Sequence, residues 1–391
     1  MRDQWSRMQL LLGFFSKQVD ANNLVISSHP VWGYDYNPSY GAYTGKFTKL
    51  NILYAMTLEN AASLADAVQN ATAALQYRRQ AIAVRRAVNT YLYNSTAKFY
   101  MISDQQTAGI AQDTNSLAIL SGIAAELNSN ISQQLLQQMK EKLRVSNVNG
   151  TGYLSTTSDG IPVVASVIVS PYISFFHAAA AFEQDRSDLA FDVLDSVWAP
   201  MAQAGPYFTG TFWESERPNG YPGASTSMAH SWSAGITAIL SKYVLGIKPV
   251  AAGYTKWSIR PQQGNLTWAA GSVSTPYGII TVNWNNSNAE FRIMVNIPRS
   301  TSGVIYIPAK ENCVIVNRSP LPVGSVNNSV YGVDKISRNG SSLEVYIISS
   351  GPYSIISNSF VCNTVSSLFV RSSNFSCLLL CFFITLLQLS L

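Results

Sequence analysis

The hydrophobic periodicity of this chain changes once, at Gly246, and that change decides which folds are open to it. Before Gly246, apolar residues recur every three or four positions, which is typical of amphipathic helices. After Gly246, short runs rich in β-branched and aromatic residues alternate with a period of two, which is typical of strands in an antiparallel sheet. The sequence therefore predicts a mainly α-helical region followed by a β domain.

The region before Gly246 contains a series of helical segments joined by loops that carry many aromatic residues. Helices of this length, connected in series, favour antiparallel hairpins packed as a bundle or a toroid. Ser132 is a predicted N-cap and Gly246 a predicted helix stop. Long aromatic loops, such as 27–45 and 205–222, are where binding sites tend to be built on such a scaffold. The predicted helices span residues 4–19, 46–68, 73–93, 111–127, 132–144, 167–183, 187–203 and 224–245.

The region after Gly246 predicts an antiparallel β-sandwich of about 100 residues. A connector leads into strand-like runs from residue 255 onward, and Pro-Tyr-Gly at 276–278 predicts a tight hairpin. A chain of 391 residues is long enough to form two cores. The predicted domains are 1–246 for the helical domain, 247–357 for the sandwich, and 358–391 for a polar spacer and hydrophobic tail.

Charged residues make up only 12% of the chain, about half the usual share. The densest basic run, at 78–86, has helical spacing among apolar residues, which favours the solvated face of a helix over a nucleic-acid patch. The three histidines, His29, His177 and His230, are far apart and belong to no metal-binding motif. No nucleotide-binding or nucleophilic-serine motif is present either. We expect neither a metal ion nor another cofactor.

Ten Asn-x-Ser/Thr motifs favour a glycosylated protein of the secretory pathway. Cys313 and Cys362 are the cysteines of the globular part, and they are either one disulfide or two buried free thiols. The ten motifs begin at Asn70, Asn94, Asn130, Asn149, Asn265, Asn285, Asn317, Asn327, Asn339 and Asn374.

The chain ends in an uncharged apolar run, 377–391, which is too short to cross a bilayer core. Because a polar spacer precedes it, we expect a glycosylphosphatidylinositol (GPI) attachment signal and a place at the cell surface. A marginal membrane anchor or an apolar tail is the alternative. The start of the chain has no matching signal peptide. We therefore expect these 391 residues to be the C-terminal part of a longer protein.

Candidate chemistry is concentrated in the segment GTFWESERPNGY, residues 210–221. Cleavage of a glycosidic bond needs two carboxyl groups, and Glu214 places a carboxylate directly after Trp213. Glu214 is a catalytic group on one interpretation and an ordinary loop glutamate paired with Arg217 on the other. Glu216 adjoins Arg217, which favours a structural role for it. Read alone, His230 is a structural histidine.

The residues around this segment resemble the end of the bacterial and fungal α-L-rhamnosidases. The likeness is carried by TFWE (211–214), SMAHSWSAG (227–235) and the junction from ILSKYVLGIKP to TPYGIITVNW (239–284), and more weakly by AQDTNSLAILSGIA (111–124) and HPVWGYDY (29–36). It implies an inverting glycoside hydrolase with an (α/α)6 toroid followed by a β-sandwich. It also implies a rhamnose-containing oligosaccharide or glycoside as substrate.

The resemblance implies roles for individual residues. Glu214 corresponds to the general base that activates water, and His230 to a residue that hydrogen-bonds the sugar. Trp32 resembles an aromatic residue that stacks near the rhamnose, and Trp213 is a further candidate for substrate binding. The sequence departs from the family at Val31, where many relatives have Asp.

The acidic motif that carries the family's general acid is not found in this chain. Asp3 and Asp35 are the nearest carboxylates by order, and neither has that motif's context. We expect the complete protein to be a surface-anchored α-L-rhamnosidase-type hydrolase to which this chain contributes the base. The alternative is a non-catalytic cell-surface glycoprotein that retains the loops as a carbohydrate-binding face. A third interpretation keeps the fold and changes the sugar.

Overall fold

The computed structural model describes residues 2–26, 45–145, 152–157, 159, 168–223, 226–309, 312–328 and 332–358. Contacts divide the chain into two compact units, Met1–Ile239 and Leu240–Leu391, so the division falls a few residues before the predicted boundary at 246. Some sequence predictions lie outside the described residues: those on His29, Val31, Trp32, Asp35, Cys362, the side chain of Asp3 and the C-terminal tail.

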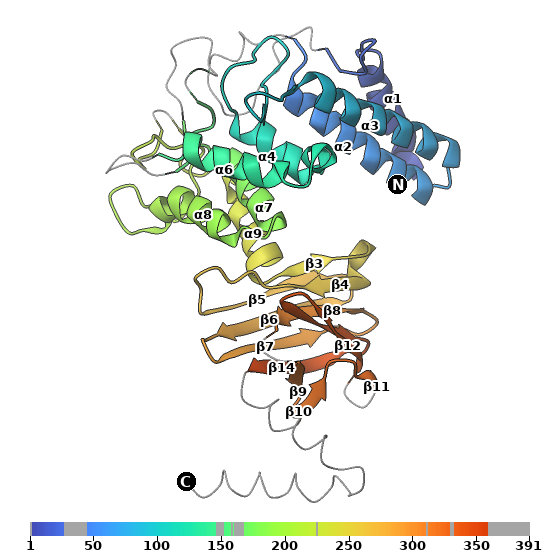
Figure 1. Ribbon diagram of the computed structural model, residues 1–391, viewed down its shortest axis with the longest axis vertical. Coiled ribbons are helices and arrows are strands. Elements are labelled where there is room, and N and C mark those ends of the chain that lie inside the picture. The colour runs from blue at the N-terminus through green and yellow to red at the C-terminus, as the bar shows by residue number, and fades with distance from the viewer. Residues whose placement is uncertain are drawn as a thin grey trace, which may run out of the picture. The chain divides into compact units, whose positions relative to one another are not determined.

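The first unit is helical, as the periodicity predicts (Figure 1). The segment 111–127 forms two helices rather than one, because Gly122 adopts a left-handed backbone (φ 75°) between them. The helices are α1 (Arg2–Ser16), α2 (Thr48–Ala67), α3 (Ala71–Tyr91), α4 (Gln112–Leu120), α5 (Ile123–Leu127), α6 (Ile131–Leu143), α7 (Pro171–Glu183), α8 (Ser187–Ala202) and α9 (Gly235–Ile239), with a short strand pair, β1 (Tyr93–Asn94) and β2 (Phe99–Tyr100).

Helices α2 and α3 form a tightly packed antiparallel hairpin, and α7 packs against both α4 and α8. Asn70 ends the short connection of the first hairpin, and its Oδ1 accepts a hydrogen bond from Ala73 N that caps α3. Small side chains such as Ala55, Ala62 and Ala81 are fully buried along these helices, which lets the backbones approach closely. The hairpin is therefore held by packing along both helices and by a cap at its turn.

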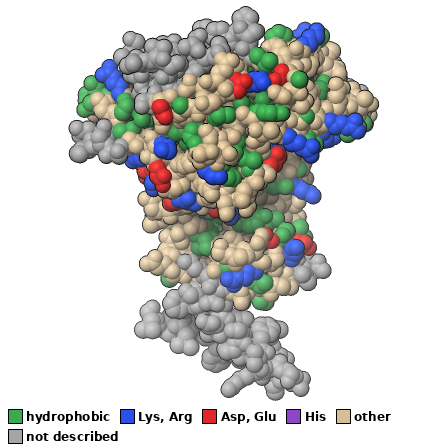
Figure 2. All heavy atoms as spheres, turned by 45° about the horizontal axis from the view of Figure 1, so that its top comes forward, with side chains coloured by type: hydrophobic (Ala, Val, Ile, Leu, Met, Phe, Trp, Pro, Cys, Tyr) green, Lys and Arg blue, Asp and Glu red, His purple; other side chains and the backbone are tan. Residues whose placement is uncertain are grey.

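The basic run at 78–86 lies on α3 and belongs to a helix face with ion pairs, as its spacing predicts. Arg78 pairs with Asp66 of α2. Arg85 pairs with Glu59 at 3.0 Å and with Glu126 at 2.6 Å. On the face of the molecule shown in Figure 2, charged side chains form small groups between wide neutral areas. This distribution agrees with the low charged fraction of the sequence.

Two predicted helix starts are wrong. Helix α6 begins at Ile131, so Ser132 is already buried inside its first turn instead of capping it. The helix predicted from 224 begins only at Ser231, because the preceding residues pair with another segment of the chain and are extended. From Ser231 the backbone passes from a 3-10 turn, η3 (Ser231–Ala234), through α9 to a π-helical turn, η4 (Leu240–Val244). No helix among the described residues is both long and apolar enough to cross a bilayer.

The second unit is a sandwich of two six-stranded sheets (Figure 1). One sheet has the order β10-β9-β14-β7-β6-β5 and the other β11-β12-β13-β8-β4-β3. A short 3-10 turn, η5 (Ala252–Tyr254), lies between the first two strands. The strands are β3 (Ile247–Pro249), β4 (Lys256–Ile259), β5 (Trp268–Thr275), β6 (Gly278–Asn286), β7 (Glu290–Ile297), β8 (Ser302–Pro308), β9 (Cys313–Val316), β10 (Ser319–Pro322), β11 (Val326–Asn328), β12 (Val333–Asn339), β13 (Ser342–Ile347) and β14 (Gly351–Asn358).

Among the described strands, the sandwich is antiparallel except at one place, where β4 pairs in parallel with β8. The strands between them in the sequence, β5 to β7, belong to the opposite sheet, so the chain returns to β4 in the same direction. Trp257 of β4 and Trp284 of β6 are buried in the core. Gly303 allows the parallel pairing, because a Cβ there would lie 2.1 Å from Trp257 O and 2.4 Å from its ring.

The turn residues of the second unit act as predicted. Pro-Tyr-Gly closes the β5–β6 hairpin, in which Thr275 pairs with Gly278. Gly246 has φ 81°, and a Cβ at this position would meet the backbone of Arg260 at 2.2 Å. A non-glycine residue is therefore excluded where the helical turn ends and the first strand begins. Cys313 is disulfide-bonded, and its predicted partner lies outside the described residues, so that pairing stays a prediction.

Candidate functional site

The predicted site consists of two loop segments that pair side by side within the first unit. Phe212 O accepts a hydrogen bond from His230 N at 2.8 Å, and Glu214 N donates to Ser227 O at 2.9 Å. Thr226 Oγ1 accepts from Ser215 N at 3.1 Å. These hydrogen bonds bring Glu214 and His230, which are 16 positions apart in the sequence, side by side.

The carboxylate of Glu214 is held at one oxygen and open at the other. Its Oε2 accepts a hydrogen bond from Ser227 N at 3.0 Å and lies 3.8 Å from His230 Nδ1. Oε1 accepts no hydrogen bond from the described residues, and the side chain is 33% exposed. The alternative partner, Arg217, makes no ion pair with Glu214 within the described part of the chain. This geometry leaves one oxygen free to take a proton from a water molecule.

Trp213 faces away from this carboxylate. Its side chain is 1% exposed, and its backbone N lies 3.4 Å from Met201 Sδ of α8. Successive residues of an extended segment point to opposite sides, so the indole is in the core while Glu214 reaches solvent. No face of Trp213 is open to a sugar ring in this arrangement. Its burial instead anchors the segment that carries Glu214.

Another set of aromatic side chains lies beside His230. The His230 ring lies 4.2 Å from the Trp232 ring, which in turn stacks on Tyr172 at 5.3 Å. Tyr172 meets Phe176 edge to face at 5.4 Å. All four side chains are partly exposed. They supply a partly apolar wall next to the carboxylate, of the kind that a sugar ring requires.

Sequence reasoning did not assign Tyr172 or Trp232 to the site. Trp232 lies two residues after His230 and could have been recognised from that spacing. Tyr172 gave no signal of its own, because it lies on α7, far away in the sequence. Tyr172 reaches the site because α7 packs closely against the segment that follows His230. Gly235 allows this close packing, since a Cβ at that position would lie 2.7 Å from Phe175 of α7.

Glu216, which the sequence assigned to a structural role, is fully buried. Its backbone bridges Val169, with hydrogen bonds of 2.9 and 3.0 Å, and also Pro222. Neither side-chain oxygen has a hydrogen-bond partner among the described residues. Burial raises the pKa of Glu216 well above its usual range, because the charged form loses its hydration. A buried carboxyl group whose protonated form is favoured therefore lies two residues from the partly exposed carboxylate of Glu214.

A buried ion pair joins the first turns of α2 and α4, and the sequence did not predict it. Lys49 Nζ lies 3.1 Å from Asp113 Oδ2, and both side chains are almost fully buried. Next to Asp113 in the sequence, Gln112 Nε2 lies 3.2 Å from His177 Nδ1. Burial lowers the pKa of His177 to about 3, against a smaller opposing effect of Asp192. His177 is therefore a neutral core residue.

Within the described ranges, no three His, Cys, Asp or Glu side chains are grouped closely enough to hold a metal ion. The arrangement around Glu214 instead offers a carboxylate, an imidazole and stacked aromatic rings. These groups can orient a neutral ring and accept a proton from water. They define a candidate site for a hydrolytic step on a polar, non-ionic substrate.

Comparisons with known proteins identify the fold of the chain. Residues 246–319 match the bacterial alpha-L-rhamnosidase C-terminal domain. The structure of an α-L-rhamnosidase from Dictyoglumus thermophilum matches with a TM-score of 0.68 at 15% identity, over 91% of this chain and 37% of that one. The Streptomyces avermitilis α-L-rhamnosidase complexed with L-rhamnose matches with a TM-score of 0.66 at 16% identity, over 91% and 30%. The chain therefore has an α-L-rhamnosidase-like fold, with helical hairpins followed by a β-sandwich.

Curated sequences agree with these structures. An α-L-rhamnosidase of Alteromonas sp. (strain LOR) is 28% identical over 209 residues, which are 51% of this chain and 20% of the relative. An α-L-rhamnosidase of Formosa agariphila is 26% identical over 234 residues, or 56% and 23%. The chain thus spans about a fifth of the length of these relatives. The predicted resemblance to the C-terminal portion of the α-L-rhamnosidases is confirmed.

Proposed function

We propose that this chain contributes the general base and part of the sugar-binding wall to an inverting glycoside hydrolase acting on terminal α-L-rhamnosides. The observation that carries the proposal is the pairing of TFWE with SMAHSWSAG. It holds Glu214 by one oxygen and sets His230 and Trp232 beside it. The curated relatives are named α-L-rhamnosidases, and their likeness supports rhamnose as the sugar.

In this mechanism Glu214 Oε1 accepts a proton from a water molecule that attacks the anomeric carbon. The new C–O bond forms on the face opposite the leaving oxygen, so the configuration inverts. The leaving oxygen takes its proton from a second carboxyl group, about 6.5–9.5 Å from the base. We assign that acid to no residue of this chain. Ser227 N keeps Oε2 fixed, so only Oε1 is free for the proton transfer.

His230 positions both the substrate and the base. Its backbone N is bound to Phe212 O, which fixes the residue, and its ring lies against Trp232. The ring can exchange a hydrogen bond with a sugar hydroxyl while Nδ1 stays near Glu214 Oε2. Tyr172 extends the aromatic wall for the apolar face of the ring.

The test is turnover of an aryl α-L-rhamnoside by the complete protein with Glu214→Gln. Loss of a general base lowers kcat by about 10² to 10⁴. Glu216→Gln is the matched control in the same segment, and we expect it to keep most of the activity because that side chain is buried. Proton NMR of the first product checks inversion. Near-normal turnover by Glu214→Gln would reject the assignment, and binding without hydrolysis by the wild type would favour the non-catalytic glycoprotein.

We further propose a secretory location, which rests on the glycosylation motifs. Five of the ten acceptor asparagines are exposed side chains of the described residues, as N-glycosylation requires. Expression in a eukaryotic host, followed by endoglycosidase treatment, should lower the apparent mass. Release from membranes by a phosphatidylinositol-specific phospholipase tests the predicted lipid anchor. The five are Asn130, Asn265, Asn285, Asn317 and Asn339.

A further inference from the structure

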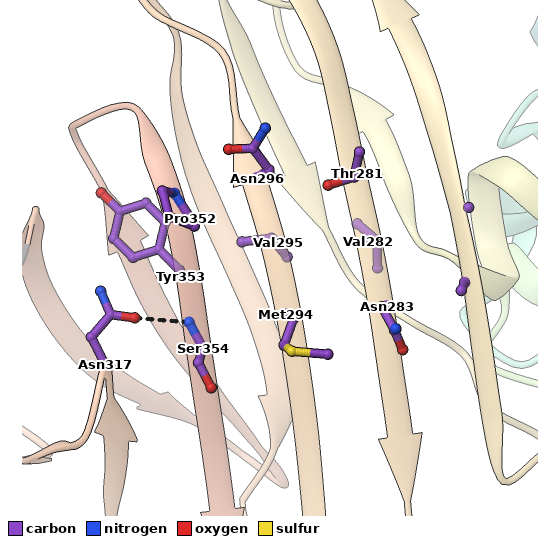
Figure 3. Close-up of a pocket in the computed structure, with 12 residues that line it drawn as sticks. Thr281, Val282, Asn283, Met294, Val295, Asn296, Asn317, Pro352, Tyr353 and Ser354 are labelled. Atoms are coloured by element: carbon purple, nitrogen blue, oxygen red, sulfur yellow. Dashed lines mark hydrogen bonds between the residues drawn. The ribbon is translucent and has the colours of Figure 1, made fainter.

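The outer face of the β5–β6–β7–β14 sheet carries an open hollow of about 650 Å³ that the proposed function does not use (Figure 3). It is formed by the second unit alone. Strand pairing arranges its floor in rows across the sheet. One row runs Asn283, Met294, Ser354. The next row runs Thr281, Asn296, Pro352.

These side chains point outward because their neighbours in each strand point inward. Val282, Ile293 and Val295 alternate with them and are buried in the core of the sandwich. Nothing in the described part of the second unit covers the hollow, and Met294 is 44% exposed. The face is therefore open to a ligand.

The hollow is lined by neutral hydrogen-bonding groups. The side chains of Thr281, Asn283 and Asn296 make no hydrogen bonds to other described residues, whereas Asn317 Oδ1 is already bound to Ser354 N at 2.9 Å. Amide groups both donate and accept, and so does a hydroxyl group. No Lys, Arg, Asp or Glu lines the hollow, so a charged ligand would find no opposite charge there. The lining matches a neutral ligand rich in hydroxyl groups.

An exposed tryptophan adjoins this hollow. Trp268 is 63% exposed and lies in β5 two residues before Ala270, which lines the hollow. Residues two apart in a strand share a face, so the indole lies on the same side of the sheet. Its pairing partner, Asn285, adds another outward amide. A large exposed aromatic surface beside free amides is suited to the mixed polar and apolar faces of a sugar ring.

We propose that this face is a second carbohydrate-binding surface, which holds a neutral oligosaccharide. Trp268 stacks on one sugar ring, and Asn283, Asn296 and Thr281 hydrogen-bond the hydroxyl groups of its neighbours. Four strands spaced about 4.8 Å apart give a platform about 14 Å wide, which accommodates several sugar units rather than one. The surface goes beyond the proposed hydrolytic function, because it binds sugar without cleaving it. No acid or base lines the hollow itself. The row that holds Trp268 and Asn285 continues to Arg292, whose guanidinium is paired with Glu290 at 3.0 Å.

The test is affinity electrophoresis of the full chain in gels containing soluble polysaccharides. The probes are neutral galactomannan, arabinoxylan, xyloglucan and rhamnan, with polygalacturonate as the anionic comparison. The protein is produced in a eukaryotic host and tested before and after enzymatic removal of its glycans, because Asn285 and Asn317 are glycosylation motifs at this face. Binding by the glycosylated chain supports the surface, and binding by the deglycosylated chain alone overturns it. The variants are Trp268→Ala and the double substitution Asn283→Ala/Asn296→Ala. The control is Ile348→Ala, an exposed apolar residue directly after β13, a strand of the other sheet.

At least one neutral polysaccharide should retard the wild type and Ile348→Ala equally. Trp268→Ala should weaken that binding about tenfold or more, as truncation of an aromatic anchor does. Its thermal unfolding should be unchanged, because the side chain is mostly exposed. The proposal is overturned if no neutral polysaccharide retards the chain, or if Trp268→Ala binds like the wild type. It is also overturned if Trp268→Ala only dissociates a dimer, since the face would then be a protein interface.

Discussion

Glu216 should make the stability of the first unit depend on pH in a way that one substitution removes. Its carboxyl group is buried without hydrogen bonds among the described residues, and burial raises its pKa well above the usual value. The folded state therefore keeps this proton at a pH where the unfolded state, with an ordinary pKa of about 4.3, has lost it. The stability that the protonated group provides is complete below that pH. It is lost progressively as pH rises toward the folded pKa.

The slope of this loss is set by linkage. One group changes the unfolding free energy by at most about 1.4 kcal/mol per pH unit. For a unit of this size that corresponds to at most about 3–6 °C in Tm per pH unit. Glu216→Gln has no proton to lose, so it should remove this part of the slope and exceed the wild type in Tm at pH 8.

The measurement is Tm by circular dichroism or calorimetry at half-unit steps from pH 4.5 to 8.5. Glu141→Gln, at an exposed position on α6, is the control and should run parallel to the wild type. If the curves for the wild type and Glu216→Gln are parallel, Glu216 is not a buried neutral acid. A lower Tm for Glu216→Gln at pH 8 would contradict the reasoning equally.

Three further substitutions test other parts of the structure. Gly303→Ala drives a Cβ into Trp257 and should cost about 1–3 kcal/mol or more of unfolding free energy, measured by urea denaturation. Lys49→Met removes the cation that lies 3.1 Å from Asp113 Oδ2. Burial raises the pKa of Asp113 to about 8, so the loss of unfolding free energy in the same assay should be small below that pH, where the carboxyl group takes up a proton, and should approach about 3–5 kcal/mol above it. His230→Gln should raise the KM for an aryl rhamnoside severalfold, because one sugar hydrogen bond is worth about 1 kcal/mol.

Each of these has its own control and its own contradicting outcome. Gly205→Ala meets no atom within 4 Å and should be tolerated, so equal losses at both glycines would argue against the clash at Gly303. Lys256→Met removes an exposed cation, and it should cost far less than Lys49→Met. For His230→Gln, a change in kcat with an unchanged KM would point to a role in orienting Glu214 instead of binding the sugar.

The periodicity of the sequence predicted most of the fold, because each unit buries one face of its elements. The strand-like runs predicted from residue 255 onward form strands, and the turn at 276–278 is present. One wrong helix start arose where a non-local contact overrode local preference: pairing of His230 with Phe212 keeps the backbone before Ser231 extended. The parallel pairing of β4 with β8 could not be predicted from the sequence, because hydrophobic periodicity contains no information on the direction of a neighbouring strand.

The candidate site was predicted in part. The resemblance singled out Glu214 and His230, and the structure brings them to within 3.8 Å. Trp213 was predicted to bind substrate because it adjoins Glu214 in the sequence, but its side chain is buried. Neighbouring residues of an extended segment point to opposite sides. The local sequence did not reveal that Glu216 is buried, since its burial depends on the bridges to Val169 and Pro222. Tyr172 and the Lys49–Asp113 pair come from distant helices, and only the tertiary structure places them.

The parallel pairing of β4 with β8 sets an order of events during synthesis. Lys256 leaves the ribosome well before Ser302, its partner, so β4 has only β3 beside it while β5, β6 and β7 emerge. During that interval the first sheet can form hairpins from local contacts, whereas the second lacks its central strand. The edge of β4 that pairs with β8 in the folded protein stays unpaired until β8 has been synthesised. Unpaired strand edges promote aggregation. Ribosome-bound chains stalled before residue 302 should therefore be the ones that chaperones retain.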